Sequence, residues 1–170
     1  MADMKSSGVK PFVILRVFDA PRDRVWAAWT EVEHFKHWWG PKGFTLSYCQ
    51  IDLRPGGKGH YCLLAPDGSE MWGKCAYREI TRPERLVWIN SFSDKDGGTT
   101  SHPMNPNWPR DMLTTVRFEA QGAKTKVTIE WIPVDGSSAI ELQSFDDGRQ
   151  SMTMGWTGTL DQCTSYLEKK

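Results

Sequence analysis

The first forty residues carry one strand pattern followed by two helical patterns. Residues 11–19 are rich in β-branched and aromatic side chains, which predicts a strand. Pro21 then supplies a helix start signal, and Trp26 and Trp29 recur at helical spacing. We therefore expect an amphipathic helix that turns its tryptophans inward. A second short helix is expected over 32–38, before a Gly-Pro pair.

The middle of the chain carries short strand patterns separated by turn signals. Pro66-Asp67-Gly68 is a strong hairpin signal, and Gln121-Gly122 joins the last two strands. A long loop with two glycines and three prolines is expected over 93–110. The predicted strands cover residues 44–53, 59–65, 70–80, 85–92, 112–120 and 124–133.

The last third of the chain returns to helical spacing. Ser137 or Ser138 can cap a helix, because Glu141 follows at capping-box spacing. Three glycines in this stretch lower intrinsic helix stability by ~1 kcal/mol each, so we expect them to allow a close approach or a bend over the sheet. One apolar face of a long helix is predicted by Met152, Trp156, Leu160, Cys163 and Leu167.

This order of elements predicts an α+β fold. Consecutive strands joined by short turns imply one antiparallel sheet of about seven strands. A curved sheet wrapped around one long helix leaves a space between its concave face and the helix, and the two short helices close one end of that space. We expect one domain over residues 11–170, preceded by a disordered leader at 1–10.

Six sequence pieces follow one another in the order found in a known family. They are Trp38-Trp39-Gly40-Pro41-x-Gly43-Phe44, Asp52-Leu53-Arg54-Pro55-Gly56-Gly57, Pro66-Asp67-Gly68, Tyr77-x-Glu79-Ile80, Pro83-Glu84-Arg85-Leu86-Val87 and Gly155-Trp156-x-x-x-Leu160. From about Val13 to Leu167 the chain resembles the family named after the activator of the ninety-kilodalton heat-shock protein ATPase. Ala20-Pro21-x-x-x-Val25-Trp26 resembles the start of the helix-grip fold, which START lipid-transfer domains share.

The resemblance implies a START-like helix-grip domain that encloses a cavity. The co-chaperone that gives the family its name carries this fold as one of two domains and contacts the chaperone mainly through the other. Most single-domain relatives resemble ligand-binding proteins with no assigned reaction, some members of the wider superfamily are aromatase/cyclases, and one kind of relative gives resistance to enediyne antibiotics. Two departures, Gly59 in place of a bulky residue and the long 93–110 loop, would change the size or mouth of the cavity.

Composition and charge argue against several classes of partner. Basic and acidic residues both number 21, so the net charge is zero, and a basic stripe for nucleic acid is not expected. No apolar run approaches the ~20 residues of a membrane span, and the N-terminus lacks the apolar core of a signal peptide. We therefore expect a cytoplasmic protein without a nucleic-acid or membrane partner. Cys49, Cys62 and Cys75 fall on predicted strands and are expected to be structural thiols.

Nine tryptophans in 170 residues either close a core or line a cavity that a ligand fills. Pairing two strands around the Asp67-Gly68 turn places Tyr61, Leu63 and Trp72 on one face, which we expect to be concave; a slip of one residue would reverse this. Trp88 fits either face, whereas Trp156 should point at the sheet. Trp38 and Trp39 form a gate or a plug, and at least one is expected to plug the short helices onto the sheet. The expected ligand-binding residues are Trp39, Tyr61, Leu63, Trp72, Trp88 and Trp156.

The polar candidates for catalysis are weaker. His34 and His37 share a helical face without an evident third metal ligand. His60 has the chemistry of a general base, but no partner carboxylate can be placed beside it. Lys74 and Arg78 are in phase with Trp72, and a salt bridge or the outer face is favoured for them. No glycine-rich phosphate loop is present, so no catalytic residue, metal ligand or cofactor is assigned.

We therefore expect a protein that sequesters or senses a small hydrophobic, aromatic molecule in the cavity between sheet and helix. A cyclase- or hydrolase-type enzyme that uses the same cavity remains an alternative, and it predicts a titratable pair near the cavity floor. A stress-related chaperone partner is the other alternative, and it predicts an exposed apolar patch. A homodimer is compatible with the sequence, which does not set its interface.

Overall fold

A computed structural model describes residues 9–169 of the chain, so the expected leader lies outside the described residues except for its last two positions. The elements are β1 (Phe12–Phe18), α1 (Arg22–Thr30), α2 (Val32–Phe35), β2 (Thr45–Ile51), β3 (Lys58–Leu64), β4 (Glu70–Thr81), β5 (Arg85–Phe92), β6 (Met112–Gln121), β7 (Lys124–Pro133), α3 (Ala139–Asp147) and α4 (Arg149–Glu168). All seven expected strands are present. Within the described part of the chain, no helix is both long and apolar enough to cross a membrane.

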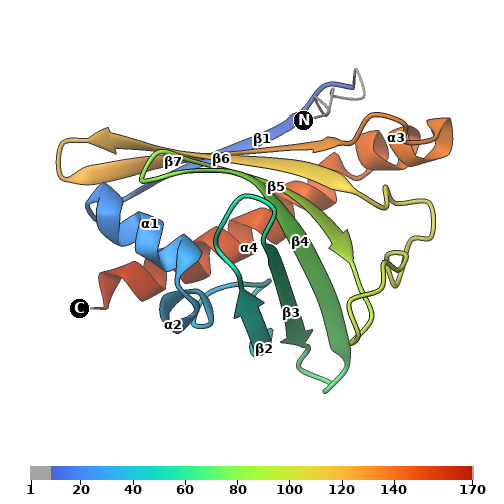
Figure 1. Ribbon diagram of the computed structural model, residues 1–170, viewed down its shortest axis with the longest axis horizontal. Helices are drawn as coiled ribbons and strands as arrows, with labels where there is room; N and C mark the ends of the chain where they lie inside the picture. The colour runs from blue at the N-terminus through green and yellow to red at the C-terminus, as the bar shows by residue number, and fades with distance from the viewer. Residues whose placement is uncertain (1–8, 170) are drawn as a thin grey trace.

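The seven strands form one antiparallel sheet in the order β1-β7-β6-β5-β4-β3-β2. Sequential strands from β2 to β7 pair with their neighbours, and β1 closes the far edge beside β7. The sheet curves strongly, and α4 runs along it with α1 and α2 beside its C-terminal half (Figure 1). This is the α+β arrangement that the order of elements predicts, and it is the helix-grip architecture that the family resemblance implies.

Side-chain alternation on β1 shows which face of the sheet is covered. Phe12 and Phe18 are buried beneath the helices, whereas Val13, Leu15 and Val17 lie on the outer face and are 43–53% exposed. On the same face, Trp131 of β7 lies opposite Phe12 and Ile129 lies opposite Ile14, which continues the apolar surface. The core therefore lies on the concave side of the sheet, toward α1 and α4.

The C-terminal helical segment is divided into two helices at Gly148. Ser138 caps α3 as expected, because its hydroxyl accepts from the Glu141 N–H and the Glu141 carboxylate accepts from the Ser138 N–H. A Cβ atom at Gly148 would lie 2.7 Å from the ring of Trp108. The glycine thus allows the 93–110 loop to approach the helix junction closely, as the sequence suggested for the glycines of this region.

The β3–β4 hairpin corrects one expectation about the concave face. Its loop contains three residues, Pro66 to Gly68, because Ala65 donates to Ser69, and Gly68 takes the left-handed conformation at φ 87°. The sequence-based register assumes a two-residue turn. The longer loop slips the pairing by one position, so that Leu63 faces Met71 and Trp72 lies on the outer face.

Candidate functional site

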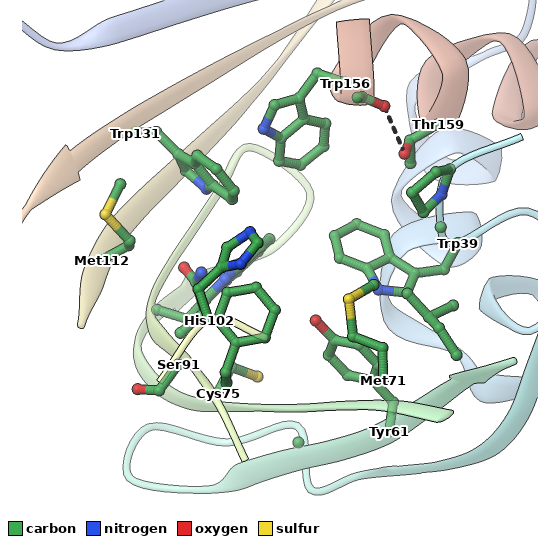
Figure 2. A pocket seen from close by; sticks show the side chains of 18 of the residues that line it. Trp39, Tyr61, Met71, Cys75, Ser91, His102, Met112, Trp131, Trp156 and Thr159 are labelled. Carbon is green, nitrogen blue, oxygen red and sulfur yellow. Dashed lines mark hydrogen bonds between the residues drawn. The ribbon is translucent and has the colours of Figure 1, made fainter. Parts of the chain in front are cut away.

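A cavity of about 530 Å³ lies between the concave face of the sheet and the helices. Strands β2 to β7 supply one wall, α1, the segment after α2 and α4 supply the other, and the 93–110 loop lines the mouth. Figure 2 shows side chains from sheet, helix and loop converging on this space. The curvature of the sheet keeps the two walls apart, so large side chains line the space without filling it.

Six of the nine tryptophans line the cavity, and two others belong to the solid core. Trp26 and Trp38 are almost fully buried, and the Trp38 N–H donates to the Ala28 carbonyl at 2.9 Å. Trp38 therefore holds α1 and α2 together within the core, in the structural role expected for one member of the pair. The tryptophans of the cavity wall are Trp29, Trp39, Trp88, Trp108, Trp131 and Trp156.

Four of these rings form a continuous aromatic surface, the indole wall, made of Trp29, Trp39, Trp131 and Trp156. The Trp156 ring lies 5.5 Å from Trp131, 5.8 Å from Trp39 and 6.4 Å from Trp29, measured between ring centroids. Trp156 hangs from α4 toward the sheet, with Trp131 and Trp39 on either side of it in Figure 2. The expectation that Trp156 points at the sheet is confirmed.

The indole wall carries donors without acceptors. The N–H groups of Trp29, Trp131 and Trp156 are buried and have no hydrogen-bond partner among the described residues, whereas that of Trp39 opposes the rise of the Tyr61 pKa through a hydrogen bond. An indole N–H is a donor only, and a buried donor without an acceptor costs free energy. The wall thus offers an apolar surface with several donor positions within it.

Two thiols and two phenols form the cavity floor, which consists of Cys49, Tyr61, Cys75 and Tyr77. The ring of Tyr61 crosses β4 at Gly73, where a Cβ atom would lie 2.5 Å from the ring. Burial raises the pKa of both thiols to about 11 and that of Tyr61 to about 12, and it also raises the pKa of Tyr77. All four groups are therefore neutral at physiological pH, and the thiols are poor nucleophiles.

Asn90 on β5 places a carboxamide on the sheet wall of the cavity. Its side-chain oxygen accepts a hydrogen bond of 2.5 Å from the hydroxyl of the fully buried Thr114. Thr114 lies directly opposite Trp131 on the neighbouring strand. The hydrogen bond fixes the orientation of the carboxamide, so that its NH₂ group remains the free polar end of Asn90.

The 93–110 loop is fastened to the helices at the cavity mouth. Asn105 donates to the Ser144 hydroxyl, and the backbone N–H of Arg110 donates to Glu141. Burial disfavours the charged form of Glu141, but hydrogen bonds from Ser138 and Arg110 prevail and lower its pKa. His102 lies between the rings of Phe92 and Trp108, and burial lowers its pKa. The loop is therefore an ordered rim of the cavity.

Five of the six residues expected to bind a ligand line the cavity: Trp39, Tyr61, Leu63, Trp88 and Trp156. Trp72 does not. It packs against Tyr48 and His60 on the outer face and donates to Glu70, which follows from the one-residue shift of the hairpin. Sequence reasoning missed Trp131 and Asn90, although Asn90 is two residues from Trp88 and shares its strand face.

The charged and titratable candidates take structural positions. The His60 ring contacts the Asp94 carbonyl at 3.2 Å, and Lys74 donates to the Gly97 carbonyl, so both hold the start of the 93–110 loop. His34 contacts the Tyr166 hydroxyl at 2.6 Å, and the His37 ring stacks on Tyr166. Within residues 9–169, no group of three His, Cys, Asp or Glu side chains is placed to hold a metal ion, and no Asp or Glu lines the cavity.

The fold and the cavity together define a helix-grip domain with an internal, neutral, aromatic-lined chamber. Residues 19–168 match the sequence family described as "Activator of Hsp90 ATPase homolog 1-like protein", and the chain belongs to this family. The resemblance carried by the Trp38–Phe44 piece and its successors is thereby confirmed. The chain has no significant match among curated proteins.

Solved structures with the same fold cover nearly the whole chain. Protein Ms6760 from Mycobacterium smegmatis is 21% identical with a TM-score of 0.77, and the match covers 100% of this chain and 96% of that one. A protein from Arthrobacter aurescens, solved by NMR, is 26% identical with a TM-score of 0.77 and coverage of 98% and 90%. The AHSA1 protein from Silicibacter pomeroyi is 15% identical, with a TM-score of 0.71 and coverage of 94% and 98%.

Proposed function

We propose that this protein binds a small hydrophobic, aromatic molecule in the cavity between sheet and helix, and that it sequesters or senses that molecule. The observation that carries the proposal is the set of six tryptophans around one space of about 530 Å³. Side chains of this size would otherwise be expected to pack against one another and close the space. A chamber that remains open between flat rings fits a flat apolar guest.

The chemistry of the walls favours binding over reaction. The floor holds neutral thiols and phenols, and among the described residues no carboxylate lines the cavity to complete an acid–base pair. Burying ~300 Å² of ligand apolar surface at ~25 cal/mol per Å² supplies ~7 kcal/mol before the cost of ordering the ligand. Because the ordering cost subtracts from this gain, we expect a dissociation constant of roughly ten micromolar or weaker for a simple aromatic probe.

The test uses N-phenyl-1-naphthylamine, a neutral aromatic probe whose emission rises when it leaves water. We expect saturable binding to the full chain and a rise in melting temperature at saturating probe. A Gly155→Phe variant places a ring on the cavity side of α4, at a glycine whose Cβ position has open space around it. This variant should bind the probe at least tenfold more weakly.

Two controls separate blocked binding from damaged folding. Gly155→Ala adds only a methyl group at the same position and should bind the probe as the unaltered chain does. Trp72→Phe removes an indole outside the cavity and should likewise leave probe binding unchanged. Absence of saturable binding to the unaltered chain, or equal binding by Gly155→Phe, would contradict the proposed function.

A further inference from the structure

We propose that the cavity selects neutral aromatic molecules that carry a carbonyl-type oxygen, and that this oxygen accepts hydrogen bonds from the indole N–H groups of Trp131 and Trp156, beside the NH₂ group of Asn90. The proposal rests on the proposed function and names the chemical class of its ligand. Three observations support it: the two indole donors, the orientation of the Asn90 carboxamide, and the charges of the residues that line the cavity.

The first observation is the pair of indole donors on opposite walls. Trp131 extends from β7 and Trp156 from α4, with ring centroids 5.5 Å apart and planes at 78°. Trp156 is 6% exposed, and neither N–H has a hydrogen-bond partner within residues 9–169. In Figure 2 the nitrogen of Trp156 lies on the edge of its ring that faces Trp131. The two rings are in edge-to-face contact, so an oxygen on the cavity side of this contact would lie near donors from two elements.

Aromatic faces are a weaker alternative partner for these donors. An N–H directed at the face of a neighbouring ring gains only a second-order interaction. A carbonyl oxygen has two lone pairs and gives a full hydrogen bond, which in a buried site is favoured because the donor is otherwise unpaired. A ligand with an acceptor oxygen would therefore gain affinity that a hydrocarbon of the same shape would not.

The second observation is the orientation of Asn90. The Asn90 oxygen accepts a hydrogen bond from the Thr114 hydroxyl, and this orients the carboxamide so that its NH₂ group is the end left for a ligand. Asn90 and Thr114 lie on β5 and β6, and Trp131 lies opposite Thr114 on β7. Three adjacent strands therefore place a second donor group beside the Trp131 donor.

The third observation is the absence of a counter-charge in this region. Among the described lining residues the guanidinium of Arg110 is the one permanent cation, and it lies at the mouth, where it donates to the Thr99 carbonyl. An anionic carboxylate deep in the cavity would lose its hydration without gaining a partner charge. The donors around Trp131 thus suit a ketone, quinone or lactone oxygen rather than an anion.

The test compares two four-ring molecules of the same shape. Benzanthrone carries a ring ketone, and benzanthrene carries a methylene group in its place. Each is titrated against the full chain by displacement of N-phenyl-1-naphthylamine. We expect benzanthrone to bind about tenfold or more tightly than benzanthrene, the effect of one or two neutral hydrogen bonds. The indole ¹H resonances of Trp131 and Trp156 should move downfield with the ketone and not with the hydrocarbon.

Variants locate the preference in the named donors. Trp131→Phe and Trp156→Phe keep an aromatic ring but lose the N–H, so each should bring the affinity ratio of the two molecules toward one. The matched control is Trp88→Phe, which also shortens an aromatic side chain of the cavity wall and should keep the full ratio. A ratio that is unchanged in both indole variants would overturn the assignment of the donors.

The remaining outcomes separate this inference from the proposed function. Equal affinity of the unaltered chain for ketone and hydrocarbon would overturn the acceptor-oxygen inference and leave aromatic binding intact. Displacement by neither molecule, while the naphthylamine probe binds, would also overturn the inference alone. Failure of the naphthylamine probe itself to bind would contradict the proposed function first.

Discussion

Trp38 and Trp39 are neighbours in the sequence with different surroundings in the fold. Trp38 is 1% exposed, donates to the Ala28 carbonyl and packs 4.8 Å from the Trp29 ring. Trp39 lies against Tyr61 at 6.0 Å and faces the cavity. The first therefore stabilises the attachment of the short helices, whereas the second shapes the chamber.

Replacement of Trp38 should be costly for stability. We expect Trp38→Ala to lower the free energy of unfolding by about 3–5 kcal/mol, because it leaves a large hole and an unpaired Ala28 carbonyl. Urea denaturation measures the loss. Trp72→Ala, at a half-buried position on the outer face, should cost about 1 kcal/mol. Similar losses in the two variants would show that Trp38 is not part of the core.

The sequence predicts that one member of the Trp38–Trp39 pair is structural without indicating which. That choice depends on where α2 ends, and helix ends are set by local hydrogen bonds that apolar spacing does not specify. Asn90 illustrates the opposite case. Alternation along a strand already places it on the same face as Trp88, but only knowledge of that face reveals that it borders a cavity.

At the scale of elements, spacing predicts strands and helices better than it predicts their registers. The hairpin between β3 and β4 is recognisable from Pro66-Asp67-Gly68 alone. Its three-residue loop, however, turns Trp72 to the outer face, because one residue of slip exchanges the two faces of a strand. The helical spacing of the last third likewise contains Gly148, but it does not predict that α3 ends and α4 begins there.

The contact between Gly148 and the 93–110 loop provides a test of how the rim is held. A Gly148→Ala side chain would meet the Trp108 ring at 2.7 Å and displace it. We expect a loss of about 1–3 kcal/mol in the free energy of unfolding and faster tryptic cleavage after Arg110, because the loop detaches from the helix junction more often.

Gly155→Ala is the matched control for this change. Gly155 lies in α4 with open space around its Cβ position, so alanine there should stabilise the helix by up to ~1 kcal/mol and leave the cleavage rate unaltered. If Gly148→Ala is cleaved at the same rate as the unaltered chain and is equally stable, Trp108 does not fasten the loop.

At the scale of the whole molecule, the neutral groups of the cavity floor make the free energy of unfolding fall as the pH becomes alkaline. The folded-state pKa values of Cys49 and Cys75 are about 11 and that of Tyr61 is about 12, above their ordinary values of 9.0 and 10.0. A raised pKa favours the protonated group in the folded state. Its stabilising contribution is complete below the ordinary pKa and is lost as pH rises toward the folded-state value.

The free energy of unfolding should therefore fall between about pH 9 and pH 12, as urea denaturation at a series of pH values would measure. Tyr61→Phe removes one of the titrating groups. As the pH rises from 8 toward 11, the free energy of unfolding should therefore fall less in the variant than in the unaltered chain. An identical pH dependence in both proteins would show that the Tyr61 phenol is in contact with bulk water.

The row of indoles that leads from the core into the cavity wall also has an optical consequence. Consecutive rings from Trp38 through Trp29 and Trp156 to Trp131 lie 4.8, 6.4 and 5.5 Å apart. Such neighbours exchange excitation energy faster than they emit light. Excitation absorbed by any ring of the row therefore migrates to the ring with the lowest excited state, and the polarisation of the light is lost on the way. A single quencher beside Trp156 would darken the whole row, so a quenching molecule in the cavity would be detected through the intrinsic fluorescence of several rings at once.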